Sequence, residues 1–122
     1  MKVRSGFVSN SSTSSFIVVG MKFESQPTIE QMKTWIDADM KLQNKFSHFY
    51  DDGAYEDYFY DNYFVDHEST SPLVGLSLVY WSDEYEEVEV DITKIEAYRK
   101  RLSTILDEPV SKIKLYATTI AS

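Results

Sequence analysis

The stretch Phe16-Ile17-Val18-Val19-Gly20-Met21-Lys22-Phe23 decides the fold, because most of its side chains are β-branched or aromatic. Such a nearly continuous run is typical of a strand that is buried on both faces of a sheet. The dipeptide Gln26-Pro27 follows and ends the strand. We therefore expect residues 16–23 to lie inside a sheet, with the other elements arranged around them.

Two helices are predicted from capping patterns and apolar spacing. Thr28 with Gln31 matches a capping box, and apolar residues then recur three and four positions apart as far as Met40, which predicts a helix over 28–45. Thr93 with Glu96 repeats the capping pattern and predicts a second helix over 93–107.

Three further strands complete the predicted α+β fold. They are expected over 73–81, 85–92 and 112–120, and the middle one alternates between apolar residues on one face and carboxylates on a solvent-exposed face. With the strand over 16–23, the element order is βαββαβ. This is the order of a ferredoxin-like fold, a mostly antiparallel four-stranded sheet with two helices on one face. Element order alone leaves other α+β topologies open.

Residues 46–71 form an acidic and aromatic insertion in this single domain of 122 residues. Asp52-Gly53 is typical of a turn. Ala54 to Phe64 has the length of three helical turns, with Tyr55, Phe59 and Tyr63 on one side and Tyr58 and Tyr60 pointing elsewhere.

The charge is concentrated in the middle of the chain. The formal charge is −8, and residues 46–93 contain 13 carboxylates, no Lys or Arg, and 12 of the 18 aromatic residues. Acidic tails are poor in aromatic residues, so we expect this segment to fold and to present its carboxylates on a shaped surface. Non-specific nucleic-acid binding is disfavoured because it requires clustered cations. The chain has no Cys, and hence no disulfide or thiolate chemistry.

The aromatic and acidic segment is the candidate partner-binding surface. Tyr contributes contact area and a hydroxyl group at low entropic cost, and carboxylates attract a basic partner. The expected partner is therefore a protein with a basic surface, with neither direct nucleic-acid nor membrane binding. The candidate residues are Asp51, Asp52, Tyr55, Glu56, Asp57, Tyr58, Tyr60, Asp61, Glu87 and Glu89. The alternative is that these rings complete the core while the carboxylates keep the chain soluble.

No catalytic residue or cofactor is assigned from the sequence. A metal-dependent enzyme remains an alternative, because His48 and His67 both have neighbouring carboxylates, including Asp51 and Asp66. Their spacing matches no established ligand motif. A nucleotide site has weak support, since no phosphate-binding glycine motif is present.

The N-terminal segment contains Gly6-Phe7-Val8-Ser9-Asn10-Ser11-Ser12-Thr13-Ser14-Ser15-Phe16. Its short hydroxyl and amide side chains favour a loop ahead of the first strand. The string resembles the opening of small uncharacterised proteins from tailed phages and some bacteria, which begin with a GFVSNSSSSSF-like segment. The resemblance covers about the first 18 residues and implies a phage origin, but it carries no biochemical activity.

These observations lead to one expected function and two alternatives. The expected function is a cytoplasmic, non-enzymatic phage-type effector that inhibits a host protein, in the manner of a nucleic-acid mimic, through its acidic aromatic surface. The alternatives are the small metal- or nucleotide-dependent enzyme and a phage structural or assembly protein that acts through sheet edges. The oligomeric state is left open.

Overall fold

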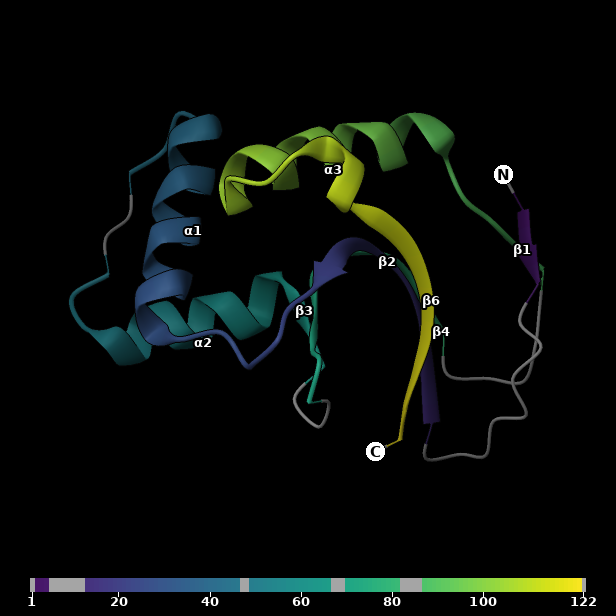
Figure 1. The fold of residues 1–122 in the computed structure, drawn as a ribbon, viewed down its shortest axis with the longest axis horizontal. Helices are drawn as coiled ribbons and strands as arrows, with labels where there is room; N and C mark the ends of the chain where they lie inside the picture. The colour runs from purple at the N-terminus through teal and green to yellow at the C-terminus, as the bar shows by residue number, and fades with distance from the viewer. Residues whose placement is uncertain (1, 5–12, 47–48, 67–69, 82–86, 122) are drawn as a thin grey trace.

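A four-stranded antiparallel sheet with the strand order β3–β4–β2–β6 organises the computed structural model (Figure 1). Its strands span Phe64–Val65 (β3), Leu73–Trp81 (β4), Thr13–Lys22 (β2) and Lys114–Ala121 (β6). The structure describes residues 2–4, 13–46, 49–66, 70–81 and 87–121. β2 lies between β4 and β6, and its Ile17, Val18 and Val19 are fully buried, which confirms the prediction of an internal strand.

β2 and β4 approach each other closely at two facing glycines. Gly20 lies opposite Gly75 in the strand register. A Cβ atom on Gly20 would lie 2.2 Å from the carbonyl oxygen of Val74, and one on Gly75 would lie 2.0 Å from that of Val19. Because both distances are far below van der Waals contact, this pairing requires residues without a side chain.

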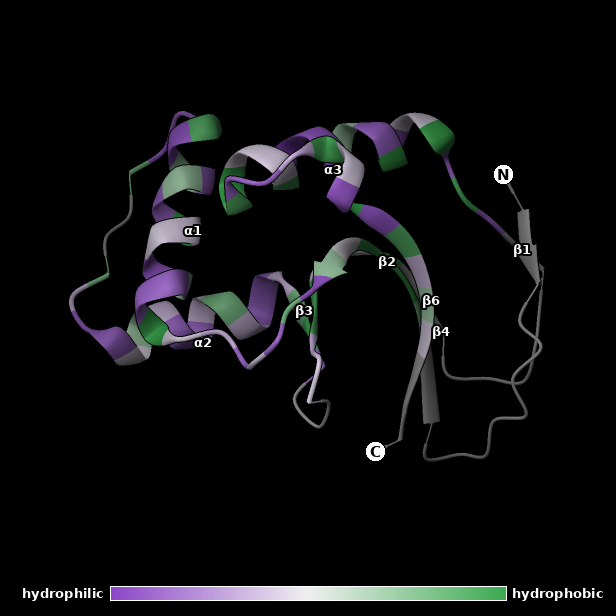
Figure 2. Ribbon diagram, in the orientation of Figure 1, coloured by the Kyte–Doolittle hydropathy of each residue, from purple (hydrophilic) through white to green (hydrophobic). Residues whose placement is uncertain are grey.

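The helices gather on one side of the curved sheet (Figure 1). They span Ile29–Leu42 (α1), Asp52–Asn62 (α2) and Ile92–Leu106 (α3), and a short 3-10 helix, η1, spans Val110–Lys112. α3 packs on β2 and β4, whereas α1 packs against α2 and α3. Hydrophobic and hydrophilic residues alternate along these ribbons in Figure 2, as expected for helices with one buried face.

The structure confirms the α+β class and the antiparallel sheet but differs from the ferredoxin-like prediction. A third helix, α2, is present, and β4 occupies the position beside β2 that the ferredoxin-like order gives to the strand over 85–92. That segment contributes only Glu87–Glu89 (β5), which pairs with Lys2–Arg4 (β1) in a separate two-stranded sheet.

β1 and β5 form a short antiparallel ladder. Its register places Lys2 opposite Glu89 and Arg4 opposite Glu87. The loop predicted for the hydroxyl-rich segment ahead of the first strand is wrong at its end, because β2 already begins at Thr13. Lys2–Arg4 form β1, for which no strand was predicted. Residues 5–12 lie outside the described part.

The helix boundaries test the capping predictions directly. Thr28 and Gln31 form the predicted capping box of α1, with bonds of 3.1 and 2.9 Å between side chain and backbone. α3 begins one residue earlier than predicted, because the Asp91 carboxylate accepts hydrogen bonds from the backbone N–H groups of Thr93 and Lys94. Asp91 is therefore a helix cap, and Ile92 is exposed, so neither belongs to an alternating strand.

Among the described residues, no helix combines the length and the apolar character needed to cross a lipid bilayer.

Candidate functional site

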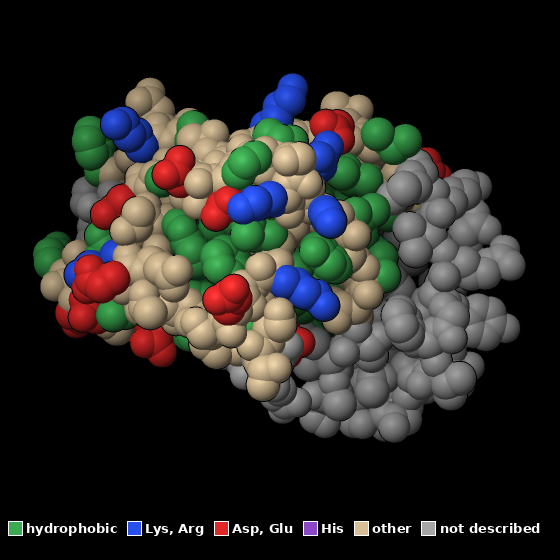
Figure 3. Space-filling view, viewed as in Figure 1, with side chains coloured by type: hydrophobic (Ala, Val, Ile, Leu, Met, Phe, Trp, Pro, Cys, Tyr) green, Lys and Arg blue, Asp and Glu red, His purple; other side chains and the backbone are tan. Residues whose placement is uncertain are grey.

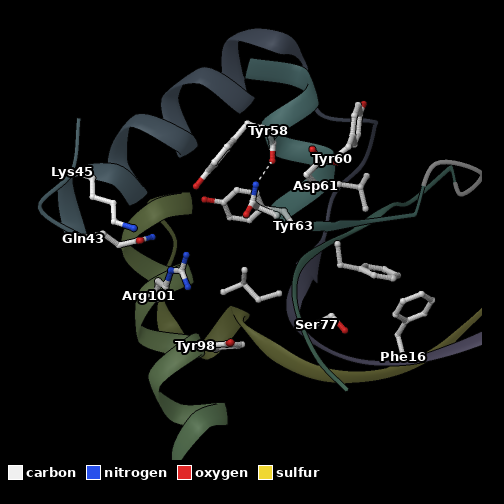
Figure 4. A pocket seen from close by; sticks show the side chains of 14 residues that line it. Phe16, Gln43, Lys45, Tyr58, Tyr60, Asp61, Tyr63, Ser77, Tyr98 and Arg101 are labelled. Carbon is white, nitrogen blue, oxygen red and sulfur yellow. Dashed lines mark hydrogen bonds between the residues drawn. The ribbon is translucent and has the colours of Figure 1, made fainter. Parts of the chain in front are cut away.

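A cleft of about 590 Å³ opens where the three helices meet the edge of the sheet (Figure 4). The segment that follows α1 contributes Gln43 and Lys45, and α3 contributes Tyr98 and Arg101. The end of α2 contributes Tyr58, Tyr60, Asp61 and Asn62, while the sheet contributes Phe16, Phe64, Leu76 and Ser77. The lining is thus rich in aromatic rings and in hydrogen-bonding groups.

A buried carboxylate holds this cleft together. Asp39, on α1, is 2% exposed and is the one buried charged residue in the described part of the chain. Arg101 donates from Nε to Oδ1 at 2.9 Å and from Nη2 to Oδ2 at 2.6 Å. Gln43 Nε2 donates to Oδ1 at 3.0 Å, and the Tyr63 hydroxyl donates to Oδ2. One carboxylate therefore joins α1, α3 and the segment after α2.

The charge states of this network follow from its contacts. Burial alone would raise the pKa of Asp39, but the hydrogen bonds from Arg101, Tyr63 and Gln43 hold that pKa below its ordinary value. Burial and the hydrogen bond to Asp39 raise the pKa of the Tyr63 hydroxyl. The same carboxylate raises the pKa of Arg101. At neutral pH the pair is therefore an ionised carboxylate and a guanidinium with a neutral phenol beside them.

Arg101 uses only part of its hydrogen-bonding capacity. Its side chain is 33% exposed, and within the described residues Nη1 has no hydrogen-bond partner. Arg99 lies two residues earlier on the same helix and uses all three of its nitrogens. Nε donates to the carbonyl oxygen of Ile113, Nη1 to the carboxylate of Glu96 and Nη2 to the carbonyl oxygen of Val110. Arg101 is thus held rigidly from one side while its other side faces the cleft.

Aromatic rings form the rest of the cleft. The rings of Phe16 and Phe64 lie 5.0 Å apart between their centroids, at the sheet side. Burial raises the pKa of the Tyr58 and Tyr60 hydroxyls, and for Tyr60 the nearby Glu56 adds to this effect. Both phenols are therefore neutral at physiological pH.

The structure separates the ten predicted partner-binding residues into three groups. Glu56, Asp57, Tyr60 and Asp61 lie exposed on α2, where their side chains are accessible to another molecule. Tyr58 is half-buried, because its ring packs against Phe49 at 5.0 Å and against the core, and it also lines the cleft.

Three of the predicted residues have contacts within the chain. Asp51 caps α2 by accepting a hydrogen bond from the backbone N–H of Ala54 at 2.8 Å. Asp52 pairs with Lys33 on α1 at 3.1 Å, and this contact raises the pKa of Lys33. The Tyr55 hydroxyl donates to Asp37 at 3.0 Å. Asp52 and Tyr55 therefore join α2 to α1, whereas Asp51 stabilises the start of α2.

Glu87 and Glu89 lie far from the α2 residues. Both belong to β5, whose partner β1 is at the opposite end of the molecule from α2 (Figure 1). Glu89 is exposed. The ten residues therefore do not share one continuous surface, and α2 contains the main group.

The suggested metal site is not assembled by the residues that can be described. His48 and His67 lie outside the described part of the chain, Asp51 serves as a helix cap, and Asp66 follows the edge strand β3. Within the described ranges, no three His, Cys, Asp or Glu side chains are grouped as metal ligands.

Sequence reasoning missed Asp39, Gln43 and Arg101. One signal was present: Asp39 lies three residues after Ile36 and four after Trp35, so it occupies an apolar position of the helix. A carboxylate at such a position requires a buried partner. The identity of that partner, 62 residues later, had no local signal.

Comparisons with protein-family models, with curated proteins and with solved structures found no match to this chain.

Proposed function

We propose that this chain is a non-enzymatic binding protein that contacts a basic surface of a partner protein through the outer face of α2. This acidic face consists of Asp52, Glu56, Asp57 and Asp61 together with Tyr60. The observation that carries the proposal is that α2 contains no Lys or Arg while its solvent side holds four carboxylates.

This arrangement works against the stability of the helix. Asp57 and Asp61 are like charges spaced four residues apart, which destabilises a helix by about 0.2–0.5 kcal/mol, whereas the charge of Asp52 is balanced by Lys33. Asp61 also lies in the last turn, where the helix dipole disfavours a negative charge. A basic partner would relieve both effects. In Figure 3, acidic side chains gather over this part of the molecule, at the lower left.

Exposed aromatic residues next to the acidic face supply apolar contact area. Tyr50 directly precedes the cap of α2 and is 98% exposed. Tyr60 lies on α2 itself and is partly exposed. Interfaces are enriched in aromatic residues, whereas a surface that only keeps a protein soluble has no use for exposed rings.

A more specific form of the proposal is a phage-type effector. The effector binds and inhibits a host protein in the cytoplasm, and a nucleic-acid-binding host protein is a suitable target because its basic cleft accepts spaced carboxylates in place of phosphates. The support for this form is the phage-like N-terminal string and the regular spacing of carboxylates on α2.

The test compares two variants with the same change of charge. The first, Glu56→Gln/Asp57→Asn/Asp61→Asn, neutralises three residues of the acidic face. The control, Glu24→Gln/Glu30→Gln/Asp107→Asn, neutralises three exposed carboxylates elsewhere. A partner is first isolated from a host lysate on the immobilised wild-type chain and then purified, and its association and dissociation rates are measured with all three proteins at two salt concentrations.

We expect the α2 variant to bind more weakly and the control to bind like the wild type. An exposed charge contributes about 0.2–1 kcal/mol, so three together weaken binding about three- to hundredfold. The loss should occur mainly in the association rate and should decrease at high salt, because attraction between exposed charges is screened. Equal binding by both variants would contradict the proposal.

A further inference from the structure

The cleft has the chemistry of a small-molecule site, and this inference is independent of the proposed protein interaction. We propose that it binds a small aromatic molecule with a single negative charge, an aromatic carboxylate. The volume of about 590 Å³ lies within the range of natural ligand pockets, which is about 300–1,000 Å³. Its lining combines aromatic rings with hydrogen-bonding and charged side chains, as is usual for such pockets.

Arg101 provides the anchor for the carboxylate. A guanidinium has two edges that each match a carboxylate with two parallel hydrogen bonds. Asp39 occupies the edge formed by Nε and Nη2. The edge formed by Nη1 and the second hydrogen of Nη2 is not used by any described residue, and the side chain is 33% exposed to the cleft. Asp39 therefore holds the guanidinium of Arg101 so that its other edge can bind the carboxylate of a ligand.

The ends of the cleft differ in polarity, which orients the ligand. In Figure 4, Arg101, Gln43 and Lys45 lie at one end, whereas Phe16 and Ser77 lie at the other. Phe64 packs against Phe16 at that second end. Both phenylalanines belong to a separate cluster on the other face of the sheet from Leu76, so a ligand with its carboxylate at Arg101 would place its ring toward Leu76 and Tyr98, where burial of apolar area adds to binding.

The charge of the cleft favours one negative charge over several. Lys45 adds one cation beside Arg101, but Asp39 already balances Arg101 and Asp61 lies on the cleft wall. The chain as a whole carries a formal charge of −8. A polyphosphate would meet too few cations here, whereas a monoanion gains two hydrogen bonds at Arg101 and the attraction of Lys45.

The ligand side of the test uses four probes that differ in one property each. 2-Naphthoate combines ring and charge, 2-naphthamide keeps the ring without the charge, acetate keeps the charge without the ring, and 2-naphthyl phosphate doubles the charge. Each is titrated into the ¹⁵N-labelled full chain, and amide chemical shifts are followed. We expect 2-naphthoate alone to give saturable shifts, centred on Asn62, Ser77 and Tyr98. Equal binding of the amide, tighter binding of the phosphate, or shifts located elsewhere would overturn the proposal.

The protein side of the test uses two lysines from the same part of the chain. Lys45→Gln removes the cation at the cleft, and Lys41→Gln removes one on α1 that does not line it. We expect Lys45→Gln to weaken 2-naphthoate binding about two- to fivefold, as for an exposed charge, with no effect of Lys41→Gln. Arg101 is left unchanged because it is part of the fold. An equal loss in both lysine variants, or no loss in Lys45→Gln, would refute the assignment.

Discussion

Replacing Asp39 with Asn tests whether the buried network stabilises the fold. The variant keeps the shape of the side chain but removes the charge that pairs with Arg101, and its amide group can no longer accept hydrogen bonds at both positions. Breaking a buried ion pair from one side costs about 3–5 kcal/mol. Because Arg101 is one-third exposed, water compensates part of this loss, and we expect a decrease of about 2–4 kcal/mol in the free energy of unfolding.

This loss is large compared with a typical domain stability of about 5–15 kcal/mol. For a chain of this length, about 4 °C of Tm corresponds to 1 kcal/mol, so Tm should fall by about 8–16 °C. Urea unfolding followed by tryptophan fluorescence measures the effect, since Trp35 is buried in the core. Glu30→Gln is the control, because Glu30 is an exposed carboxylate in the first turn of the same helix, and it should change stability by less than about 1 kcal/mol.

The pH dependence provides a second test of the same network. The folded protein holds the pKa of Asp39 below its ordinary value, so the network contributes fully above the unfolded-state pKa of about 3.9. This contribution is lost as the pH falls through the lower pKa of the folded state. The gap between wild type and Asp39→Asn should therefore be constant near neutral pH and should narrow below about pH 4. A gap under about 0.5 kcal/mol at pH 7, or one that widens in acid, would refute the reasoning.

Three further predictions concern single contacts, each measured as the free energy of unfolding. Gly75→Ala should destabilise the chain by about 3 kcal/mol or more, because its Cβ would overlap the backbone of β2. Gly53→Ala makes only an ordinary contact at 3.5 Å and should be neutral or stabilising by up to about 1 kcal/mol. Equal effects of the two substitutions would contradict this account. Asp91→Ala should lower the free energy of unfolding by about 1 kcal/mol because it removes the N-cap of α3, and Thr93→Ala should lower it clearly less. A larger loss in Thr93→Ala would show that Thr93 is the cap. Tyr63→Phe should cost about 1–3 kcal/mol through the lost hydrogen bond to a charged acceptor, and an unchanged stability would show that this bond contributes nothing.

Local signals in the sequence predicted most of the secondary structure. The capping box of Thr28 and Gln31 placed the start of α1 correctly, and the one-sided pattern of Tyr55, Phe59 and Tyr63 anticipated the buried face of α2. These signals work because each depends on residues within one or two turns of a helix. The helix of the insertion extends from Asp52 to Asn62, two residues earlier at each end than the predicted 54–64, so the turn predicted at Asp52-Gly53 is wrong.

The pairing of segments that are distant in the sequence could not be predicted from such local signals. The alternation over 85–92 is compatible with any antiparallel partner, and its observed partner β1 lies at the other end of the chain. The candidate site shows the same limit. Asp39 stands out on an apolar helix face, but its partner Arg101 resembles any other cation beside Arg99 and Lys100, because nothing local distinguishes it.

The central position of β2 has a consequence for the order of folding. Its register joins Thr13 to Ala121 on one side and Ser15 to Trp81 on the other, so both of its neighbours come from much later in the chain. Contacts between residues so far apart require large loops to close, which slows folding relative to helical proteins. On a ribosome, α1 and α2 can form soon after synthesis, whereas β2 waits with both edges unpaired until β4 and β6 emerge. β2, whose Ile17, Val18 and Val19 are fully buried in the folded chain, is therefore the strand of the main sheet that is exposed longest during synthesis.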